Sequence, residues 1–111
     1  MNAKQKNSGA QKVCPLFHQA VEVVGRRWSG AILRVLMEGP SRFGELRAAI
    51  PDLSDRLLSE RLKELEEFGL LSREVADDRP VVVTYRLTPQ GMALKPSLEA
   101  LGAWAEKWLV P

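Results

Sequence analysis

The sequence predicts a mainly helical domain with one β-hairpin, and three observations support this fold class. Apolar residues recur at spacings of three and four along most of the chain, which is the period of amphipathic helices. Between about residues 70 and 87 the period shortens to two, which is typical of strands. A length of 111 residues suits one domain with a single core, which burial against a partner would help to stabilise.

The N-terminal region is predicted to contain a flexible tail and one helix. Residues 1–12 are polar and offer almost nothing apolar to bury, so residues 13–111 are expected to form the domain. Cys14–Val24 is predicted as the first helix, because Pro15 suits a first helical turn and Gly25 suits a helix end.

Two further helices follow. Trp28–Met37 has apolar residues at helical spacing and is ended by Gly39 and Pro40, since proline cannot continue a helix. Ser41 is placed to cap a helix over Arg42–Ile50, because its hydroxyl can accept a hydrogen bond from the first turn.

The fourth helix has two unlike faces. Ser54 is expected to cap it, and Asp55 lies in its first turn, where the helix dipole favours an acid. At about 100° per residue, Leu58, Leu62 and Leu65 fall on one stripe, which predicts that they are buried. The opposite face carries Arg56, Ser59, Glu60 and Lys63.

The chain ends with a predicted hairpin and a long helix. Strands are expected over Leu70–Val75 and Val81–Leu87, joined by the turn sequence ADDRP. Thr88 suits the N-cap of a last helix that reaches about Leu109 and bends near Pro96. Helices followed by a hairpin and a closing helix are the order of a winged helix-turn-helix.

Four stretches of sequence carry a resemblance to a known family. They are CP at 14, GRRW at 25, GPSRFGELRAAIPDLSDRLLSERLKELEEFGLL at 39–71 and VTYRLTPQG at 83–91. Over residues 14–108 the chain resembles the HxlR-type winged-helix regulators, which are relatives of the MarR group in bacteria. The resemblance implies a homodimeric, cytoplasmic, DNA-binding transcription factor that often represses a neighbouring operon. It also implies, for several members, a response to oxidants or electrophiles through a cysteine near the N-terminus.

The polar face of the fourth helix is the predicted DNA-reading surface. Its first turns would enter the major groove, where Arg56 can contact guanine and Glu60 can accept from cytosine, while Lys63 is better placed for phosphate. The alternative, on periodicity alone, is a solvated face that keeps a small protein soluble. The candidate DNA-binding residues are Ser41, Arg42, Arg47, Ser54, Arg56, Ser59, Glu60, Lys63 and Arg79.

The helix before it is expected to hold phosphates. Ser41, Arg42 and Arg47 would fix the register of the protein on DNA in this way. An alternative for Arg47 is an ion pair with a nearby acid such as Glu45 or Asp52.

The hairpin tip is a less favourable DNA contact. Arg79 is its basic residue and is expected to reach the minor groove or the backbone. Asp77 and Asp78 precede it, and phosphate repels both acids.

Cys14 has two interpretations. Directly before a helix N-terminus and near Lys12, a thiol is held more readily as its reactive thiolate. Oxidation or electrophile attack there is then expected to shift a dimer between DNA-binding and non-binding geometries, with an oxidant or small molecule as inducer. The alternative is a small buried residue that closes the helix pair, since free cysteine is often buried.

Dimerisation is predicted through the first and last helices. The last helix has an apolar face too large for a domain of this size to cover alone. Two copies would present recognition helices about 34–36 Å apart, which predicts a palindromic double-stranded DNA site. The candidate interface residues are Leu98, Leu101, Trp104, Ala105 and Trp108.

Several other functions are disfavoured. One cysteine and one histidine cannot form a Cys/His zinc site of usual spacing, and neither a metal nor a cofactor is expected. His18 and Trp28 are expected to be core or capping residues. A glycine-rich phosphate loop is lacking, so an enzyme is not expected.

The remaining alternative is a winged-helix module that binds another protein and not DNA. The net charge of +2 is too small to decide between these two functions. The sequence has no apolar run of roughly 18 residues and no signal-like N-terminus, so a cytoplasmic protein without membrane contact is expected.

Overall fold

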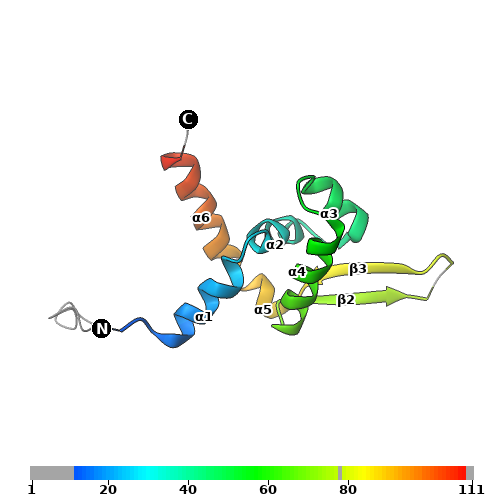
Figure 1. The fold of residues 1–111 in the computed structure, drawn as a ribbon, viewed down its shortest axis with the longest axis horizontal. Helices are drawn as coiled ribbons and strands as arrows, with labels where there is room; N and C mark the ends of the chain where they lie inside the picture. Colours follow the sequence, from blue (N-terminus) through cyan, green and yellow to red (C-terminus); the bar gives the residue numbers. More distant parts are fainter. Residues whose placement is uncertain (1–11, 78, 110–111) are drawn as a thin grey trace.

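The computed structural model describes residues 12–77 and 79–109, which fold into a winged helix-turn-helix (Figure 1). The predicted tail over residues 1–12 lies outside the described residues, apart from Lys12. None of the described helices is long and apolar enough to cross a membrane. In chain order the elements are α1 (Pro15–Val24), α2 (Ser29–Met37), β1 (Ser41–Arg42), α3 (Phe43–Ala49), α4 (Asp55–Glu67), β2 (Leu71–Ala76), β3 (Val82–Leu87), α5 (Pro89–Met92) and α6 (Lys95–Trp108).

The predicted hairpin is confirmed, and a third short strand joins it. β3 lies between β1 and β2 and is antiparallel to both. Leu71 pairs with Leu87 at the base of the hairpin, where both side chains are buried. Ser41 pairs with Tyr85, so β1 anchors the start of α3 to the sheet.

The prediction that Ser41 caps the third helix is wrong. α3 begins at Phe43, with Arg42 as its N-cap. The backbone N–H of Arg42 donates to Glu45 Oε1 at 2.7 Å, which is the bond that a first-turn carboxylate makes to the N-cap backbone in a capping box. Ser41 is instead part of the ladder with β3, which satisfies backbone groups that a cap would leave open.

The core is built from α2 and α4, which pack on the base of the hairpin. Leu58, Leu62 and Leu65 are each at most 2% exposed, which confirms the stripe predicted on α4. Burial of each such side chain contributes roughly 2 kcal/mol. The other buried apolar residues are Ile32, Leu33, Leu36, Met37, Leu46, Ile50, Leu53, Leu70, Leu71 and Leu87.

The last helix is divided into two, where one bent helix is expected from the sequence. α5 and α6 are separated by a turn at residues 93–94. Pro96 lies in the first turn of α6, where its missing N–H needs no helical acceptor. Thr88 caps α5 as predicted, because its Oγ1 accepts from the Gly91 N–H at 3.0 Å and donates to the Gly69 carbonyl at 2.6 Å.

The turn between α1 and α2 holds Trp28 in an unusual backbone conformation. Its φ of 78° is left-handed, which costs a residue other than glycine about 1–2 kcal/mol. The ring packs partly buried against the core, and the Arg27 guanidinium lies 5.0 Å from the ring centroid. Trp28 stands at the N-cap position of α2 and packs against the core, which agrees with the prediction that it is a core or capping residue.

His18 does not follow that prediction. It is exposed on α1, and its Nε2 lies 3.5 Å from Glu22 Oε2 one turn further along. The expectation that it is a core or capping residue is wrong, because α1 packs so little against its own chain.

α1 and α6 extend from the body of the domain (Figure 1). No residue of α1 or α6 is buried, and all residues of both helices are described. Leu16 and Phe17 of α1 are 74% and 63% exposed, and Trp108 of α6 is 63% exposed. These helices therefore carry large apolar side chains that their own chain leaves uncovered.

Candidate nucleic-acid interface

α4 presents its polar face to solvent because its opposite face is fixed in the core. The helix starts as predicted, since Ser54 Oγ accepts a hydrogen bond from the Leu57 N–H at 3.1 Å. Asp55 lies in the first turn. The four exposed residues of the outer face are Arg56, Ser59, Glu60 and Lys63.

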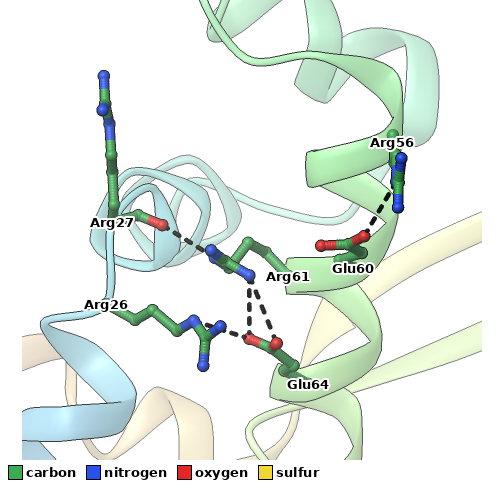
Figure 2. A network of polar contacts seen from close by, with 6 residues as sticks. All are labelled: Arg26, Arg27, Arg56, Glu60, Arg61 and Glu64. Atoms are coloured by element: carbon green, nitrogen blue, oxygen red, sulfur yellow. Dashed lines mark hydrogen bonds and ion pairs between the residues drawn. The ribbon is translucent and has the colours of Figure 1, made fainter.

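Arg56 and Glu60 form a pair along this face (Figure 2). The Nε of Arg56 donates to Glu60 Oε2 at 3.3 Å, across one turn of helix. The Arg56 side chain is 90% exposed, so water screens this pair and Glu60 restrains the arginine without covering it. The face therefore presents to solvent a partly restrained guanidinium, whose planar set of donors suits bidentate contacts.

Arg47 joins α3 to the start of α4. Its Nη1 forms an ion pair with Asp55 Oδ1. The sequence suggests Glu45 or Asp52 as acidic partners, but Glu45 already accepts from the Arg42 backbone, and the acid found is Asp55. The Arg47 side chain remains 40% exposed, so the ion pair does not prevent contact with a phosphate.

Three smaller candidates lie around these helices. Ser54 Oγ uses an acceptor position for its cap, so its own O–H is still able to donate. Ser41 is half-buried and Arg42 is exposed, and both lie on β1 at an edge of the sheet.

Arg79 lies apart from the face of α4. It is exposed between β2 and β3, at the end of a hairpin that extends away from the helices (Figure 1). Asp77 is exposed two residues before it, and Asp78 lies outside the described residues. The structure therefore does not bring Arg79 together with the residues of α4, and it offers a separate point of contact.

The sequence-based site does not include Arg61, which is a buried arginine on the inner side of α4. Arg61 is 8% exposed, and its Nε donates to the Arg27 carbonyl oxygen at 3.0 Å (Figure 2). Its Nη1 lies 3.4 Å from both carboxylate oxygens of Glu64, and Arg26 Nε lies 3.6 Å from Glu64 Oε1. A charged residue three positions after the first leucine of the stripe is the signal that indicates this site.

Cys14 precedes α1 as its N-cap and is exposed. The interpretation that it is buried against its own chain is therefore wrong. Its thiol is accessible to a reagent or to a second copy of the chain.

The expected interface residues of α6 fall into two groups. Leu101, Trp104 and Trp108 are exposed. Leu98 and Ala105 are half-buried, and Leu98 packs against the core of its own chain. The uncovered part of the apolar face is therefore the outer part of the helix, away from the domain body.

Comparison with known sequences shows that the chain is similar to transcriptional regulators. The model of the HxlR-like helix-turn-helix family matches residues 23–111. The HTH-type transcriptional regulator YvaP of Bacillus subtilis is 45% identical over 100 residues, which cover 90% of this chain and 93% of YvaP.

Solved structures agree with the sequence comparison. The reduced form of the transcriptional regulator YodB from B. subtilis has a TM-score of 0.79 at 42% identity, over 87% of this chain and 95% of that chain. Its diamide-treated form (42% identity, 89% and 98% covered) and its quinone-bound form (40% identity, 86% and 100% covered) both have TM-scores of 0.75. The redox regulator HypR in its oxidised form has a TM-score of 0.80 at 34% identity, over 85% of this chain and 96% of that chain.

Proposed function

Since the chain belongs to the HxlR-like helix-turn-helix family of transcriptional regulators, we propose that it binds a palindromic DNA operator in the cytoplasm as a homodimeric repressor. The observation that carries the proposal is the outer face of α4. Its polar residues are exposed on a helix whose opposite stripe is locked in the core. A helix held in this way can enter a major groove with its side chains already placed.

Arg56 is the proposed base-reading residue. A guanidinium can donate two parallel hydrogen bonds to O6 and N7 of guanine, and the hydrogen bond to Glu60 partly restrains this one. Ser59 is proposed to contact a base or a phosphate beside it. Lys63 lies one turn further along the face and is proposed to contact phosphate.

The residues around α4 are proposed to position it on the DNA backbone. Arg47 links the two helices and stays partly exposed, and Ser54 retains a donor at the helix start. The full set of proposed backbone contacts is Ser41, Arg42, Arg47, Ser54, Lys63 and Arg79.

Arg56→Gln and Lys63→Gln together test the reading role of α4, on a site that the purified protein selects from genomic fragments. Arg56→Gln is expected to weaken binding by about 1–3 kcal/mol and to relax preference at one base pair. Lys63→Gln is expected to lower the affinity for all DNA sequences alike. It should also reduce the slope of log affinity against log salt concentration by about 0.9 in magnitude. Equal losses on all sequences from both variants would contradict base reading by α4. Salt-insensitive binding would favour a protein-interaction module.

The proposed dimer forms through α1 and α6. A second copy would cover apolar side chains that a single copy leaves in water, such as Phe17, Leu101 and Trp104. Two-fold symmetry would also place the two α4 helices about 34–36 Å apart, one turn of DNA. A monomeric mass in light scattering would remove this part of the proposal.

Cys14 is the proposed sensor of oxidants or electrophiles. The diamide-treated and quinone-bound forms of the similar protein YodB support this class of inducer. With one cysteine per chain, a disulfide would join Cys14 to a second copy or to a small thiol, and the oxidant would accept the two hydrogens. A quinone would instead add directly to the thiolate.

Cys14→Ser tests the sensor. The variant is expected to bind the operator as the wild type does and to stay bound in diamide or quinone, which fluorescence anisotropy of labelled DNA would measure. If it loses DNA in these reagents as readily as the wild type, Cys14 is not the sensor.

A further inference from the structure

Arg61 is a buried charged group without a role in the DNA contacts proposed above. At about 100° per residue it lies about 140° around α4 from Arg56, so it faces the domain body. A buried guanidinium is unfavourable unless its donors find acceptors, so the partners of Arg61 decide what this position does.

Those partners connect α4 to the turn that follows α1. Arg61 donates to the Arg27 carbonyl at 3.0 Å and contacts Glu64, and Glu64 also contacts Arg26. We call Arg26, Arg27, Arg61 and Glu64 the α1–α4 junction (Figure 2). Arg26 and Arg27 follow the end of α1 at Val24 almost directly, so the junction holds that end of α1.

The junction borders a groove between the two helices. This groove has a volume of about 710 Å³, and its lining includes Val21 of α1, Leu65 of α4 and Phe68 just beyond α4, with Arg26 and Glu64 beside them. Apolar side chains of α1 and α4 therefore face each other across open space here. The Arg26–Glu64 ion pair joins two residues that line this groove, and Arg61 contacts the same Glu64 carboxylate, so the junction can restrain the angle between the helices.

The Arg27 carbonyl, which accepts the hydrogen bond from Arg61, belongs to a restrained turn. Arg27 precedes Trp28, whose left-handed backbone and core-packed ring leave the turn little freedom. The Arg27 guanidinium also lies over the Trp28 ring. Because the turn has little freedom to change its own backbone, a tilt of α1 would move the Arg27 carbonyl and, with it, Arg61.

We propose that Arg61 is a positioning residue that couples the orientation of the recognition helix to the orientation of α1. This inference rests on the proposed reading role of α4. In a dimer built on α1 and α6, Arg61 would fix the distance and angle between the two α4 helices. It would thus set which half-site spacing the dimer accepts, while making no contact with DNA.

Arg61→Met is the first test, because methionine keeps an apolar stem and removes every donor. Affinity for the selected operator is expected to fall about tenfold. Affinity for non-specific DNA and the salt slope are expected to stay unchanged, because no phosphate contact is lost. Operators with one base pair inserted or deleted between half-sites, which the wild type should reject, are expected to be rejected less strongly.

Arg86→Met is the matched control. Arg86 also pairs with a glutamate through two hydrogen bonds, to Glu74 at 3.0 and 3.2 Å, but it lies in the hairpin and outside the junction. The same loss of an arginine–glutamate pair there is expected to leave spacing preference as in the wild type.

Arg56→Gln on the same operator separates the two proposals. If Arg56→Gln changes nothing, the reading role of α4 fails. If Arg56→Gln weakens binding while folded Arg61→Met binds within about twofold of the wild type and keeps its spacing preference, the positioning role fails.

A second variant tests the proposal even if Arg61→Met does not fold, and a second readout tests it without DNA. Glu64→Gln alters a partly exposed side chain and weakens the junction, so about a threefold loss on the operator is expected. Spin labels on Ser59→Cys in a Cys14→Ser background would report the distance between the two α4 helices without DNA. Arg61→Met and Glu64→Gln are expected to broaden this distance distribution and Arg86→Met is not; unchanged distributions in both junction variants would overturn the proposal.

Discussion

α4 and α6 carry similar apolar stripes, but their own chain covers only one of them. Leu58, Leu62 and Leu65 of α4 are at most 2% exposed, whereas Leu101 and Trp104 of α6 are 59% and 52% exposed. Helical periodicity indicates in both cases a face that should leave water. It does not indicate whether the covering surface belongs to the same chain or to a second one.

The largest effect is expected from the stripe of α4. Leu62→Ala removes buried methyl groups from a packed core and should lower the free energy of unfolding by about 2–5 kcal/mol. Urea denaturation at a fixed protein concentration would measure it. Leu101→Ala is the matched control on α6, and if it cost as much at low protein concentration, the contrast between the two helices would not hold.

The next effect should come from the face of α6. Trp104→Glu places a charge in the proposed interface and removes an aromatic anchor. The free energy of dimerisation should therefore become less favourable by about 2–4 kcal/mol, which raises the dimer Kd. Sedimentation over a range of concentrations would measure this. Ala103→Glu introduces the same charge at an exposed position on another side of the helix and is expected to leave the dimer intact.

A smaller effect should distinguish how the two helices begin. Ser54 caps α4 through its side chain, whereas α6 follows Leu94, which makes no such bond. Ser54→Ala should lower the free energy of unfolding by about 1 kcal/mol in denaturation experiments. Ser59→Ala on the outer face of α4 is the control and is expected to change it by less than about 0.5 kcal/mol.

Features of the fold with local causes could be predicted from the sequence. The leucine stripe of α4, its Ser54 cap and the Thr88 cap each depend on residues within about one helical turn. The hairpin is likewise indicated by alternation around a turn. These signals also identified the exposed face of α4 correctly.

Features with distant partners could not be predicted in the same way. The local sequence around Ser41 predicts a helix cap, but Ser41 pairs with Tyr85 in the sheet. Arg61 donates to a backbone carbonyl 34 residues away, and no pattern around it names that acceptor. The same limit applies to the site, because the sequence shows which charges lie on a face and not which of them are already paired.

Glu60 gives the smallest expected effect and the sharpest question about the outer face of α4. An exposed pair one helical turn apart contributes only about 0.3–0.5 kcal/mol to folding, so Glu60→Gln should barely change the free energy of unfolding. Its effect on DNA binding depends on its role. If Glu60 acts as a brace, meaning that it restrains the Arg56 side chain, Glu60→Gln should lower the discrimination at the base that Arg56 reads. The effects of Glu60→Gln and Arg56→Gln on binding should then not be additive.

A double-mutant cycle on matched and mismatched operators would separate the roles of Glu60. If the effects of Glu60→Gln and Arg56→Gln add, Glu60 contacts the DNA independently, with cytosine as its expected target. If Glu60→Gln tightens binding to all sequences alike, the carboxylate acts by repelling phosphate. Non-additivity confined to the base read by Arg56 would support the brace, because the 3.3 Å hydrogen bond links Glu60 directly to the Arg56 side chain.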